Sequence, residues 1–410
     1  MDLLLIIFLV VTTIVIIEIL LRQTVLYVNK KFQWLIVEKD EVPELSEDLE
    51  KFLINGYDSE LGWTRKPNTS HTEKGKTGET KWNTNEKGAR MNPGYENKTS
   101  RISCYGDSFT FSRQVNDDET WEYFLSKILD TNVLNFGVGN YGIDQAILRM
   151  KREYVKNRTP IVILCVVPDT ISRINSVWKH YYEYGNTFGF KPKFVMEKNE
   201  LKLVKNFIDS KEKFSRYPEF LSEIKKYDYF YKNKFQKEKI HFPYIITVSK
   251  NFLRNMTIMF WVICKIVLKK LNQDTSKIDW KPMDLIMKIN LKWRVDMFRN
   301  KNQKALLKKI IEEYVEYSKI EKFTPVLVFL PQKNDVLFIK KKFHFYKDFL
   351  LDIQKISGLI HIDVIDDFLD ERNLDEIYSD NNEYGGHFSK EGNKKVATII
   401  NKKLSESNVI

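Results

Sequence analysis

The longest run of apolar positions lies at the amino-terminal end of the chain. Residues 3–21 read LLLIIFLVVTTIVIIEILL, interrupted only by two threonines and Glu18. At about 1.5 Å per residue, a helix of about 19 residues is roughly 28 Å long, which matches the hydrocarbon core of a bilayer. The pattern predicts a single membrane-spanning helix within residues 1–24. A cleavable signal peptide fits less well, because no basic segment precedes the run and no small-x-small cleavage site follows it.

Residues 25–99 are polar and rich in turn-forming residues. The segments LGWTRKPNTSHTEKGKTGET and NEKGARMNPGYENKTS contain many Gly, Asn, Pro and Thr positions. Such clusters favour turns over long regular elements. We expect a linker followed by irregular or short-stranded structure.

From residue 100 onward, short apolar runs of strand-like character alternate with helical patterns. The runs are residues 102–105, 132–138, 160–168, 325–331 and 360–366. Segments such as TWEYFLSKIL, DQAILRMKREYV and KALLKKIIEEYVEYSKI lie between them and carry apolar residues at three- and four-residue spacing. Alternating strands and helices indicate parallel βαβ units with helices on both faces of the sheet. We therefore expect an α/β protein with a three-layer α/β/α sandwich and a five-stranded parallel sheet.

The alternation stops between about residues 175 and 300, which we interpret as a mostly helical insertion within a domain of residues 100–405. The insertion contains an aromatic segment, SVWKHYYEYGNTFGFKPKF, and an apolar one, NFLRNMTIMFWVICKIVLKK. The uninterrupted apolar part of the second segment, residues 258–264, is too short to span a bilayer. It predicts a helix that is either packed in a core or docked on a membrane surface.

Composition narrows the class of protein. Hydrophobic residues make up 43% of the chain and charged residues 30%, which is typical of a folded protein. The net charge of +11 comes from lysines spread over helical segments, which favours solvated helix faces or, alternatively, contact with an anionic membrane surface. Zinc-finger spacing, an RNP-like motif and a basic tail are all absent from the sequence, so we expect no nucleic-acid partner. The six dispersed histidines predict no metal site, and GVGNYG lacks the glycine spacing of a dinucleotide loop, so we expect no cofactor.

The segment ISCYGDSFTFS, residues 102–112, carries the first candidate chemistry. Ligands of open α/β sheets bind beyond the carboxyl ends of the strands, and Ser108 follows the end of the first predicted strand. Gly106 permits a sharp turn, and Asp107 can tie the loop by hydrogen bonds to the backbone. We expect Ser108 to open the next helix with its hydroxyl exposed. The alternative is that Asp107 or Ser108 is an ordinary helix N-cap.

A second candidate lies near the carboxyl terminus, in EYGGHFSKEGNKKVATII. His387 follows two glycines, after the last predicted strand and before a closing helix. At neutral pH a serine hydroxyl is a weak nucleophile that needs a base. We expect His387 to converge on Ser108 and to remove its proton.

These segments resemble three sequence blocks of the SGNH or GDSL-type hydrolases, a family of esterases, lipases and carbohydrate acyl-hydrolases. GDSFTFS resembles the first block, NFGVGNYGIDQ the second and GGHFSKEGN the last. The resemblance implies a flavodoxin-like sheet, with Ser108 as nucleophile and His387 as general base and then acid. It also implies an oxyanion hole made by the amide of Ser108 and by that of Gly139 or Asn140, and asparagine tolerates the left-handed backbone conformation.

Two positions depart from the family pattern. In the third block, VVPDTISR places Pro168 where the family has an asparagine that donates to the oxyanion, and proline has no such donor. Losing one donor costs on the order of 3 kcal/mol of transition-state stabilisation unless another group replaces it. Tyr384 stands where the family has the acid that orients the histidine. Glu383, which we take first, Asp380 or a main-chain carbonyl are the alternatives.

Further residues are candidates for contact with substrate. Asp107 and Asp169 lie at strand ends. For Asp169, a salt bridge with Arg173 is as good an explanation as contact with substrate. Trp178 and Tyr182 lie just beyond the third strand, where aromatic faces can stack on sugars or line an acyl groove. For these two residues, packing in the core of the insertion is the alternative.

The combined expectation is a membrane-anchored serine acyl-hydrolase that cleaves acyl esters of a glycan or a lipid. An O-acyltransferase acting on a glycan and a catalytically weakened binding module with the same fold are the alternatives. The family's habit favours an exported domain. By contrast, the basic residues that follow the predicted anchor, Arg22, Lys30 and Lys31, favour a cytoplasmic one.

Overall fold

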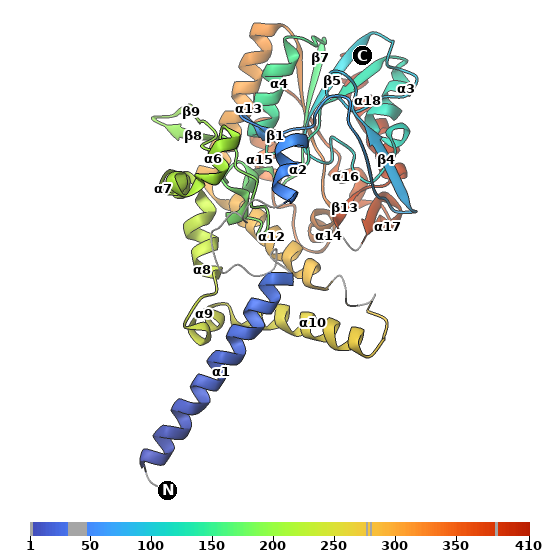
Figure 1. Cartoon of the computed structure of the whole chain (residues 1–410). Coiled ribbons are helices and arrows are strands. Elements are labelled where there is room, and N and C mark those ends of the chain that lie inside the picture. The colour runs from blue at the N-terminus through green and yellow to red at the C-terminus, as the bar shows by residue number, and fades with distance from the viewer. Residues whose placement is uncertain (1–2, 32–46, 276–277, 279–280, 382–383) are drawn as a thin grey trace. The chain divides into compact units, whose positions relative to one another are not determined.

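The computed structural model describes residues 3–31, 47–275, 278, 281–381 and 384–410 (Figure 1). The described residues form two compact units. Unit 1 is drawn from residues 1–49, 176–190 and 210–288, and unit 2 from residues 50–175, 191–209 and 289–410. The candidate nucleophile and base both belong to unit 2.

The centre of unit 2 is a five-stranded parallel sheet with the strand order β11-β10-β7-β5-β6. Its strands are β5 (Ser100–Gly106), β6 (Asn132–Asn135), β7 (Ile161–Val166), β10 (Thr324–Phe329) and β11 (Ile360–Asp363). Each strand overlaps one of the five predicted apolar runs. The prediction of a five-stranded parallel sheet with flavodoxin-like order is therefore confirmed.

The register brings the carboxyl ends of three strands to one edge of the sheet. Gly106 at the end of β5 pairs with Cys165 of β7, and Cys165 pairs with Val328 of β10. The residues that follow these strands consequently lie side by side at this edge, where open α/β sheets bind ligands.

Helices cover both faces of this sheet (Figure 1). On one face, α3 (Trp121–Leu129) packs against α18 (Lys390–Glu406), and on the other α4 (Ile143–Tyr154) packs against α13 (Lys301–Glu321). The buried residues of α13, among them Leu307, Ile310 and Tyr314, recur at three- and four-residue spacing, as expected for a helix with one face on a sheet. The three-layer α/β/α arrangement is thus as predicted.

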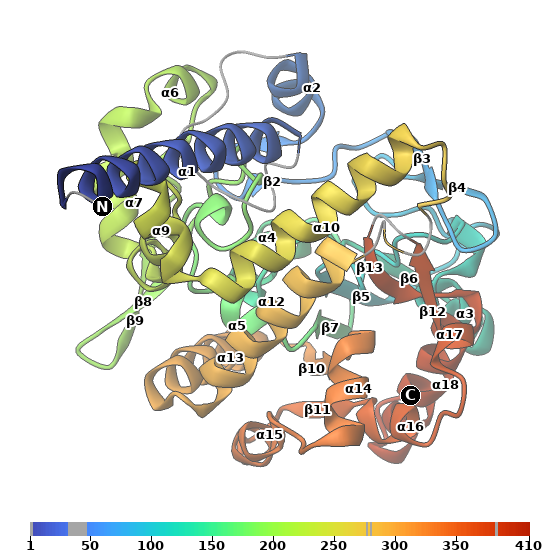
Figure 2. The same cartoon turned by 90° about the horizontal axis from the view of Figure 1, so that it is seen from below.

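Shorter elements complete the carboxyl-terminal half of unit 2. They are the last part of α12 (Lys281–Arg299), α14 (Lys333–Lys341), α15 (Lys347–Ile353), α16 (Ile365–Leu369), α17 (Leu374–Ile377) and the antiparallel pair β12 (Tyr378–Asn381) and β13 (Tyr384–Phe388). Figure 2 shows α14, α16, α17 and β13 from below.

Residues 50–99 contain a helix and two hairpins that join unit 2. The elements are α2 (Glu47–Asn55), the pair β1 (Tyr57–Asp58) and β2 (Gly62–Trp63), and the pair β3 (Ser70–Lys74) and β4 (Glu79–Asn83). Trp63 Nε1 donates to the carbonyl of Gly139 at 2.9 Å. Arg90 N donates to the carbonyl of Asn135 at 2.8 Å. These bonds fix the segment to the sheet edge that carries the second sequence block.

The long interval after the third strand contributes to both units. Its hairpin of β8 (Lys193–Glu197) and β9 (Glu200–Val204) belongs to unit 2, together with α5 (Thr170–Arg173) before it. The remaining helices belong to unit 1 and are α6 (Lys211–Ser215), α7 (Leu221–Tyr227), α8 (Gln236–Glu238), α9 (Tyr244–Lys250) and α10 (Phe252–Lys270).

Unit 1 also contains α1 (Leu3–Lys31), in which Leu3–Val28 is long and apolar enough to cross a membrane, with a mean hydropathy of 3.1. The carboxyl-terminal part of α1 packs into an apolar core. Val25 and Val28 of α1 join Tyr244 and Val248 of α9 and Ile258, Met259 and Val262 of α10, with Leu285 and Ile286 of α12 at the edge.

Candidate active site

The candidate nucleophile lies directly beyond β5. A side chain at Gly106 would place its Cβ 2.0 Å from the carbonyl oxygen of Cys165 and 2.1 Å from Thr110 Oγ1, so the strand ends on the one residue that fits there. The prediction that Ser108 opens a helix is wrong, because turns follow it and α3 begins only at Trp121. Ser112 and Gln114 have φ values of 54° and 70°, which a right-handed helix does not allow.

His387 reaches Ser108 from the other end of the chain. His387 lies on β13, paired with Ser379 of β12, rather than on an open loop. Its Nε2 is 2.8 Å from Ser108 Oγ, and the ring of Phe109 packs against the imidazole with centroids 4.8 Å apart. The structure therefore brings together the two side chains that the sequence analysis paired. Both are largely buried, Ser108 at 7% and His387 at 8% exposure.

A residue that the sequence analysis did not consider, Gln114, orients the histidine. Gln114 Oε1 is 2.8 Å from His387 Nδ1 and 3.3 Å from the backbone nitrogen of His387. A backbone N–H can only donate, so the amide atom that it meets is the acceptor oxygen. Nδ1 must then carry the proton, and Nε2 is left unprotonated to accept from the Ser108 hydroxyl. Glu383, the first choice for this role, lies outside the described residues, and Asp380 is described only as part of the backbone of β12.

The loop that carries Gln114 is held by charged groups on both sides. Gln114 N donates to Glu73 Oε1 at 2.8 Å, and Glu73 also forms an ion pair with Arg113. The guanidinium of Arg90 donates to the carbonyls of Phe111, Ser112 and Val115 and to Asp117 Oδ1. These contacts stabilise the left-handed turn that points the amide of Gln114 at the imidazole.

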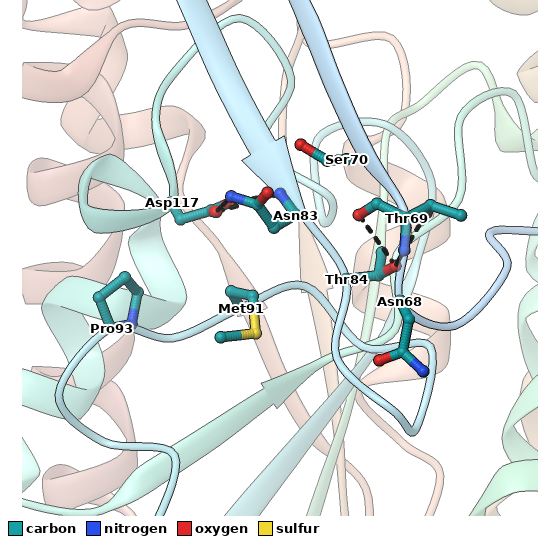
Figure 3. Close-up of a pocket in the computed structure, with 8 residues that line it drawn as sticks. All are labelled: Asn68, Thr69, Ser70, Asn83, Thr84, Met91, Pro93 and Asp117. Carbon is teal, nitrogen blue, oxygen red and sulfur yellow. Dashed lines mark hydrogen bonds between the residues drawn. The ribbon is translucent and has the colours of Figure 1, made fainter.

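A pocket of about 370 Å³ lies beside Asp117, the carboxylate that binds Arg90 (Figure 3). It is lined by Asn68, Thr69, Ser70, Asn83, Thr84, Met91, Pro93 and Asp117. Asn83 Nδ2 donates to Asp117 Oδ2 at 2.7 Å, and the hydroxyls of Thr69 and Thr84 are 2.9 Å apart. Two pairs of polar groups in the pocket thus bond to each other, and Asp117 links the pocket to Arg90 and the loop of Gln114.

The electrostatic environment favours the neutral form of the base. Burial lowers the pKa of His387 well below its usual value of 6.5, and the nearby charges of Arg113 and Arg173 lower it further. At neutral pH the imidazole is therefore unprotonated and ready to accept a proton. Its described hydrogen-bond partner on Nδ1 is a neutral amide, so no carboxylate at that position stabilises the imidazolium.

Asp107 ties the nucleophile loop to the neighbouring strand, as the sequence analysis allowed. Its carboxylate accepts from Phe109 N at 2.8 Å and from Val167 N at 3.1 Å, and Arg173 Nη1 is 3.1 Å away. Burial raises the pKa of Asp107, and the charge of Arg173 opposes this rise. Asp107 is 1% exposed, so in this conformation its oxygens serve the loop rather than a ligand.

Asp169 adopts the salt-bridge alternative. Arg173 Nε lies 3.1 Å from Asp169 Oδ2, and Arg294 Nη1 of α12 lies 3.7 Å from Asp169 Oδ1. Arg294 Nε is also 2.7 Å from Asp335 Oδ1 of α14, an ion pair whose atoms are not aligned as a hydrogen bond. Buried charges thus alternate in sign along the series Asp107, Arg173, Asp169, Arg294 and Asp335. The sequence analysis did not predict this arrangement.

The second block supplies the turn expected beside the nucleophile. Asn140 has a φ of 67°, the left-handed conformation that the sequence analysis allowed for it. A side chain on Gly137 would lie 2.2 Å from Phe111 N, and Val138 N donates to the carbonyl of Gly106 at 3.0 Å. The turn of Gly139 and Asn140 is therefore fixed against the loop of Ser108.

Trp178 and Tyr182 belong to unit 1 and are fully buried there. The ring of Trp178 stacks on Phe190 at 4.9 Å, and that of Tyr182 packs on Phe230 at 4.3 Å. The core-packing alternative accounts for both side chains in this conformation. Among the described residues there is no group of three or more His, Cys, Asp or Glu side chains that is suited to hold a metal ion.

Comparisons with known proteins bear on the fold. The sequence matches no protein-family model and no curated protein. The chain is similar to a lipolytic protein of the G-D-S-L family from Desulfitobacterium hafniense DCB-2, at 13% identity and a TM-score of 0.34 over 75% of this chain and 99% of that chain. It is also similar to a lipase/acylhydrolase from Enterococcus faecalis, at 9% identity and a TM-score of 0.35 over 75% of this chain and 96% of that chain. At these identities and TM-scores the likenesses carry no conclusion about the site, whose chemistry rests on the geometry above.

Proposed function

We propose that this protein is a serine acyl-hydrolase, attached to a membrane by α1, that cleaves acyl esters of a glycan or a lipid. The observation that carries the proposal is the continuous hydrogen-bonded series from Gln114 Oε1 through the imidazole of His387 to Ser108 Oγ, with both links at 2.8 Å. A hydroxyl, a neutral imidazole and a group that fixes the imidazole tautomer are the parts that nucleophilic acyl transfer requires.

In the proposed mechanism, Ser108 attacks the ester carbonyl while His387 Nε2 takes its proton. The amides of Ser108 and of the turn at Gly139 and Asn140 stabilise the oxyanion. His387 then returns the proton to the leaving alkoxide, and the acyl group stays on Ser108 until water attacks it with His387 again as base. Pro168 contributes no donor, so the oxyanion hole of this proposal consists of main-chain amides.

Active-site labelling tests the proposal. A serine-directed fluorophosphonate applied to the full-length protein in detergent should label the wild type and leave Ser108→Ala unlabelled. Ser112→Ala is the matched control in the same loop, because Ser112 Oγ lies near Glu122 and Asn393 at 3.3 and 3.2 Å. Equal labelling of Ser108→Ala and the wild type would refute the mechanism.

Substrate class is tested separately with the same full-length protein. We expect hydrolysis of para-nitrophenyl acyl esters, with a loss of roughly a thousandfold in kcat/KM in both Ser108→Ala and His387→Ala. Hydrolysis of acylated glycans or of lipids should then be faster than hydrolysis of these model esters. Transfer to an added glycan acceptor in excess of free acid would instead favour the acyltransferase alternative.

A catalytically weakened binding module remains the second candidate because of two observations. The position of the family's side-chain oxyanion donor is Pro168, and the group that orients His387 is an amide rather than a carboxylate. For that function, a folded protein would bind acylated glycans but show neither fluorophosphonate labelling nor ester hydrolysis.

A further inference from the structure

Helix α10 of unit 1 carries a stripe of apolar side chains that the fold leaves exposed. We call it the α10 stripe, and it consists of Leu253, Met256, Phe260, Ile263 and Val267, with exposed fractions from 39% at Met256 to 81% at Leu253. At 3.6 residues per turn these positions fall within an arc of about 80°. Five large apolar residues along one line of a helix form a contiguous patch, which differs from the isolated apolar residues common on protein surfaces.

The α10 stripe is not the face that holds α10 in unit 1. Ile258, Met259 and Val262 form that face and are buried in the core with Val25 and Val28 of α1. α10 therefore already has the packing that its own folding requires, and the α10 stripe is a second apolar face.

Helix α9 extends this apolar surface to α1. Phe242, just before α9, and Ile246, within α9, are also exposed. A largely apolar groove of about 750 Å³ lies between α9 and α1 and is lined by Ile14, Val15, Glu18, Ile19, Arg22 and residues Phe242 to Ile246. The carboxylate of Glu18 accepts from the backbone amides of Tyr244 and Ile245, so the start of α9 is fixed to α1 at that level.

The position of α9 and α10 along α1 matches one boundary of a bilayer. The apolar side chains of α1 are exposed from Leu3 to Leu20, whereas Val25 and Val28 are buried in unit 1. About 18 helical residues measure roughly 27 Å, close to the thickness of the hydrocarbon core. α9 lies beside the last turns of this exposed stretch, where Glu18 binds its start, and α10 packs with Val25 and Val28 beyond the stretch. α10 runs across α1 rather than along it (Figure 1).

Charge agrees with this placement. Arg22 follows the exposed stretch of α1, and Lys269 and Lys270 end α10. Basic residues at this depth are attracted to anionic lipid head groups, by about 1 kcal/mol each near the surface.

We propose that α9 and α10 lie in the interface of the bilayer that α1 crosses, with the α10 stripe inserted among the acyl chains of anionic phospholipids. Helices with one apolar face and basic residues near the polar face bind membranes in this orientation. The proposal concerns unit 1 and does not depend on the hydrolase activity proposed for unit 2.

Depth measurements on the full-length protein in phosphatidylcholine–phosphatidylglycerol nanodiscs test the proposal. The background is Cys264→Ser, because the two other cysteines, Cys104 and Cys165, are fully buried. An environment-sensitive fluorophore is attached at Phe260→Cys. As a control it is attached at Glu316→Cys, an exposed position of α13. Doxyl-labelled lipid should quench the probe at 260 several-fold more than the probe at 316, and aqueous iodide should do the reverse. The proposal would be overturned if iodide, and not doxyl lipid, quenched the probe at 260. Cross-linking of the unlabelled Phe260→Cys protein to a second copy of the chain would overturn it as well.

A second variant keeps the test independent of the labelled position. With the fluorophore at Leu253→Cys, the double substitution Phe260→Asp and Val267→Asp should reduce doxyl quenching several-fold, because two carboxylates oppose insertion. The protein should still resist alkaline carbonate extraction, because α1 is unchanged. Unaltered doxyl quenching in this variant would contradict the proposal, because it would show that the position of α10 does not depend on the apolar side chains of the α10 stripe.

Discussion

At the scale of single residues, the most informative side chain is Gln114. It accepts from His387 Nδ1 with a neutral amide oxygen, so it selects the tautomer without adding a negative charge. Burial and the charges of Arg113 and Arg173 keep the pKa of His387 well below 6.5. The base therefore stays unprotonated in mild acid. In the proposed mechanism each proton transfer creates an imidazolium whose Nδ1 partner among the described residues is an amide rather than a carboxylate.

Substituting Gln114 separates its orienting role from a structural one. Gln114→Ala should lower kcat by about 10² to 10⁴-fold, because the imidazole is then free to adopt the wrong tautomer. Gln114→Glu should retain orientation and raise the pKa of His387, because a carboxylate stabilises the imidazolium. The acidic limb of the profile of kcat/KM against pH should consequently move to higher pH in Gln114→Glu. Identical profiles for the wild type and Gln114→Glu would contradict this assignment.

The sequence was sufficient to pair Ser108 with His387, because Ser108 directly follows the first predicted strand and both residues lie in segments that resemble blocks of one hydrolase family. It was not sufficient to find Gln114. An amide six residues after the serine carries no signature of a triad member, and its position depends on positive φ values at Ser112 and Gln114 that no pattern of apolar residues reveals. Arg294 and Asp335 were missed for a related reason, because their meeting is a tertiary contact between α12 and α14.

Two glycines of the second block give a matched test of close packing. A Cβ at Gly137 would lie 2.2 Å from Phe111 N, whereas a Cβ at Gly139 would meet nothing within 4 Å. Gly137→Ala should lower the free energy of unfolding by about 1–3 kcal/mol and reduce fluorophosphonate labelling, since the loop of Ser108 must shift. Gly139→Ala should change the free energy of unfolding by no more than about 0.5 kcal/mol. Denaturant unfolding followed by circular dichroism measures both, and equal losses would contradict the packing argument.

At the scale of elements, the strands were predictable because both faces of the sheet are covered. β7 is buried at every position, and such a strand reads in the sequence as a continuous apolar run. The segment after β5 was not predictable, because the helix expected at Ser108 is replaced by turns up to α3. Hydrophobic periodicity reports burial, and the turns of this largely buried loop leave no regular period in the sequence.

The contact between α12 and α14 rests on a buried ion pair that can be tested by pH. Burial raises the pKa of Asp335 from 3.8 to about 6, and the charge of Arg294 opposes this rise. Arg294→Met should destabilise the protein by about 3–5 kcal/mol at pH 7, because it leaves Asp335 buried without its cation.

The pH dependence of this variant has a defined sign. Without Arg294 the pKa of Asp335 should rise further above its unfolded value of 3.8, so the folded state binds a proton in a range where the unfolded state does not. Stability of Arg294→Met relative to the wild type should therefore increase as the pH falls from 7 to 5. Thermal unfolding at both pH values measures the change, and a constant difference would argue against Asp335 as the titrating group.

At the scale of the whole molecule, α1 is the element on which the proposed membrane attachment depends. Its Leu3–Val28 segment is long and apolar enough to cross a membrane, and its side chains up to Leu20 are exposed. The apolar run that predicted this helix is visible in the sequence because Glu18 is the only charged residue between Leu3 and Leu21.

Charges placed in the middle of α1 should release the protein from membranes. Val10→Arg combined with Val11→Arg adds about 2.5–3.5 kcal/mol per residue to the cost of insertion. The wild type and the matched variant with leucine at both positions should stay in the pellet after alkaline carbonate extraction, and the arginine variant should appear in the supernatant. Retention of the arginine variant in the pellet would show that α1 is not the main attachment.

The carboxylate of Glu18 also limits how α1 can move within unit 1. It accepts from two consecutive amides at the start of α9, in a part-buried position. Rotation of α1 about its own axis, or sliding by one turn, would leave a charged oxygen and two N–H groups without partners, at a cost of several kcal/mol. α1 and the start of α9 consequently turn together, so that any tilt of α1 is passed directly to α9 and, through it, to the rest of unit 1.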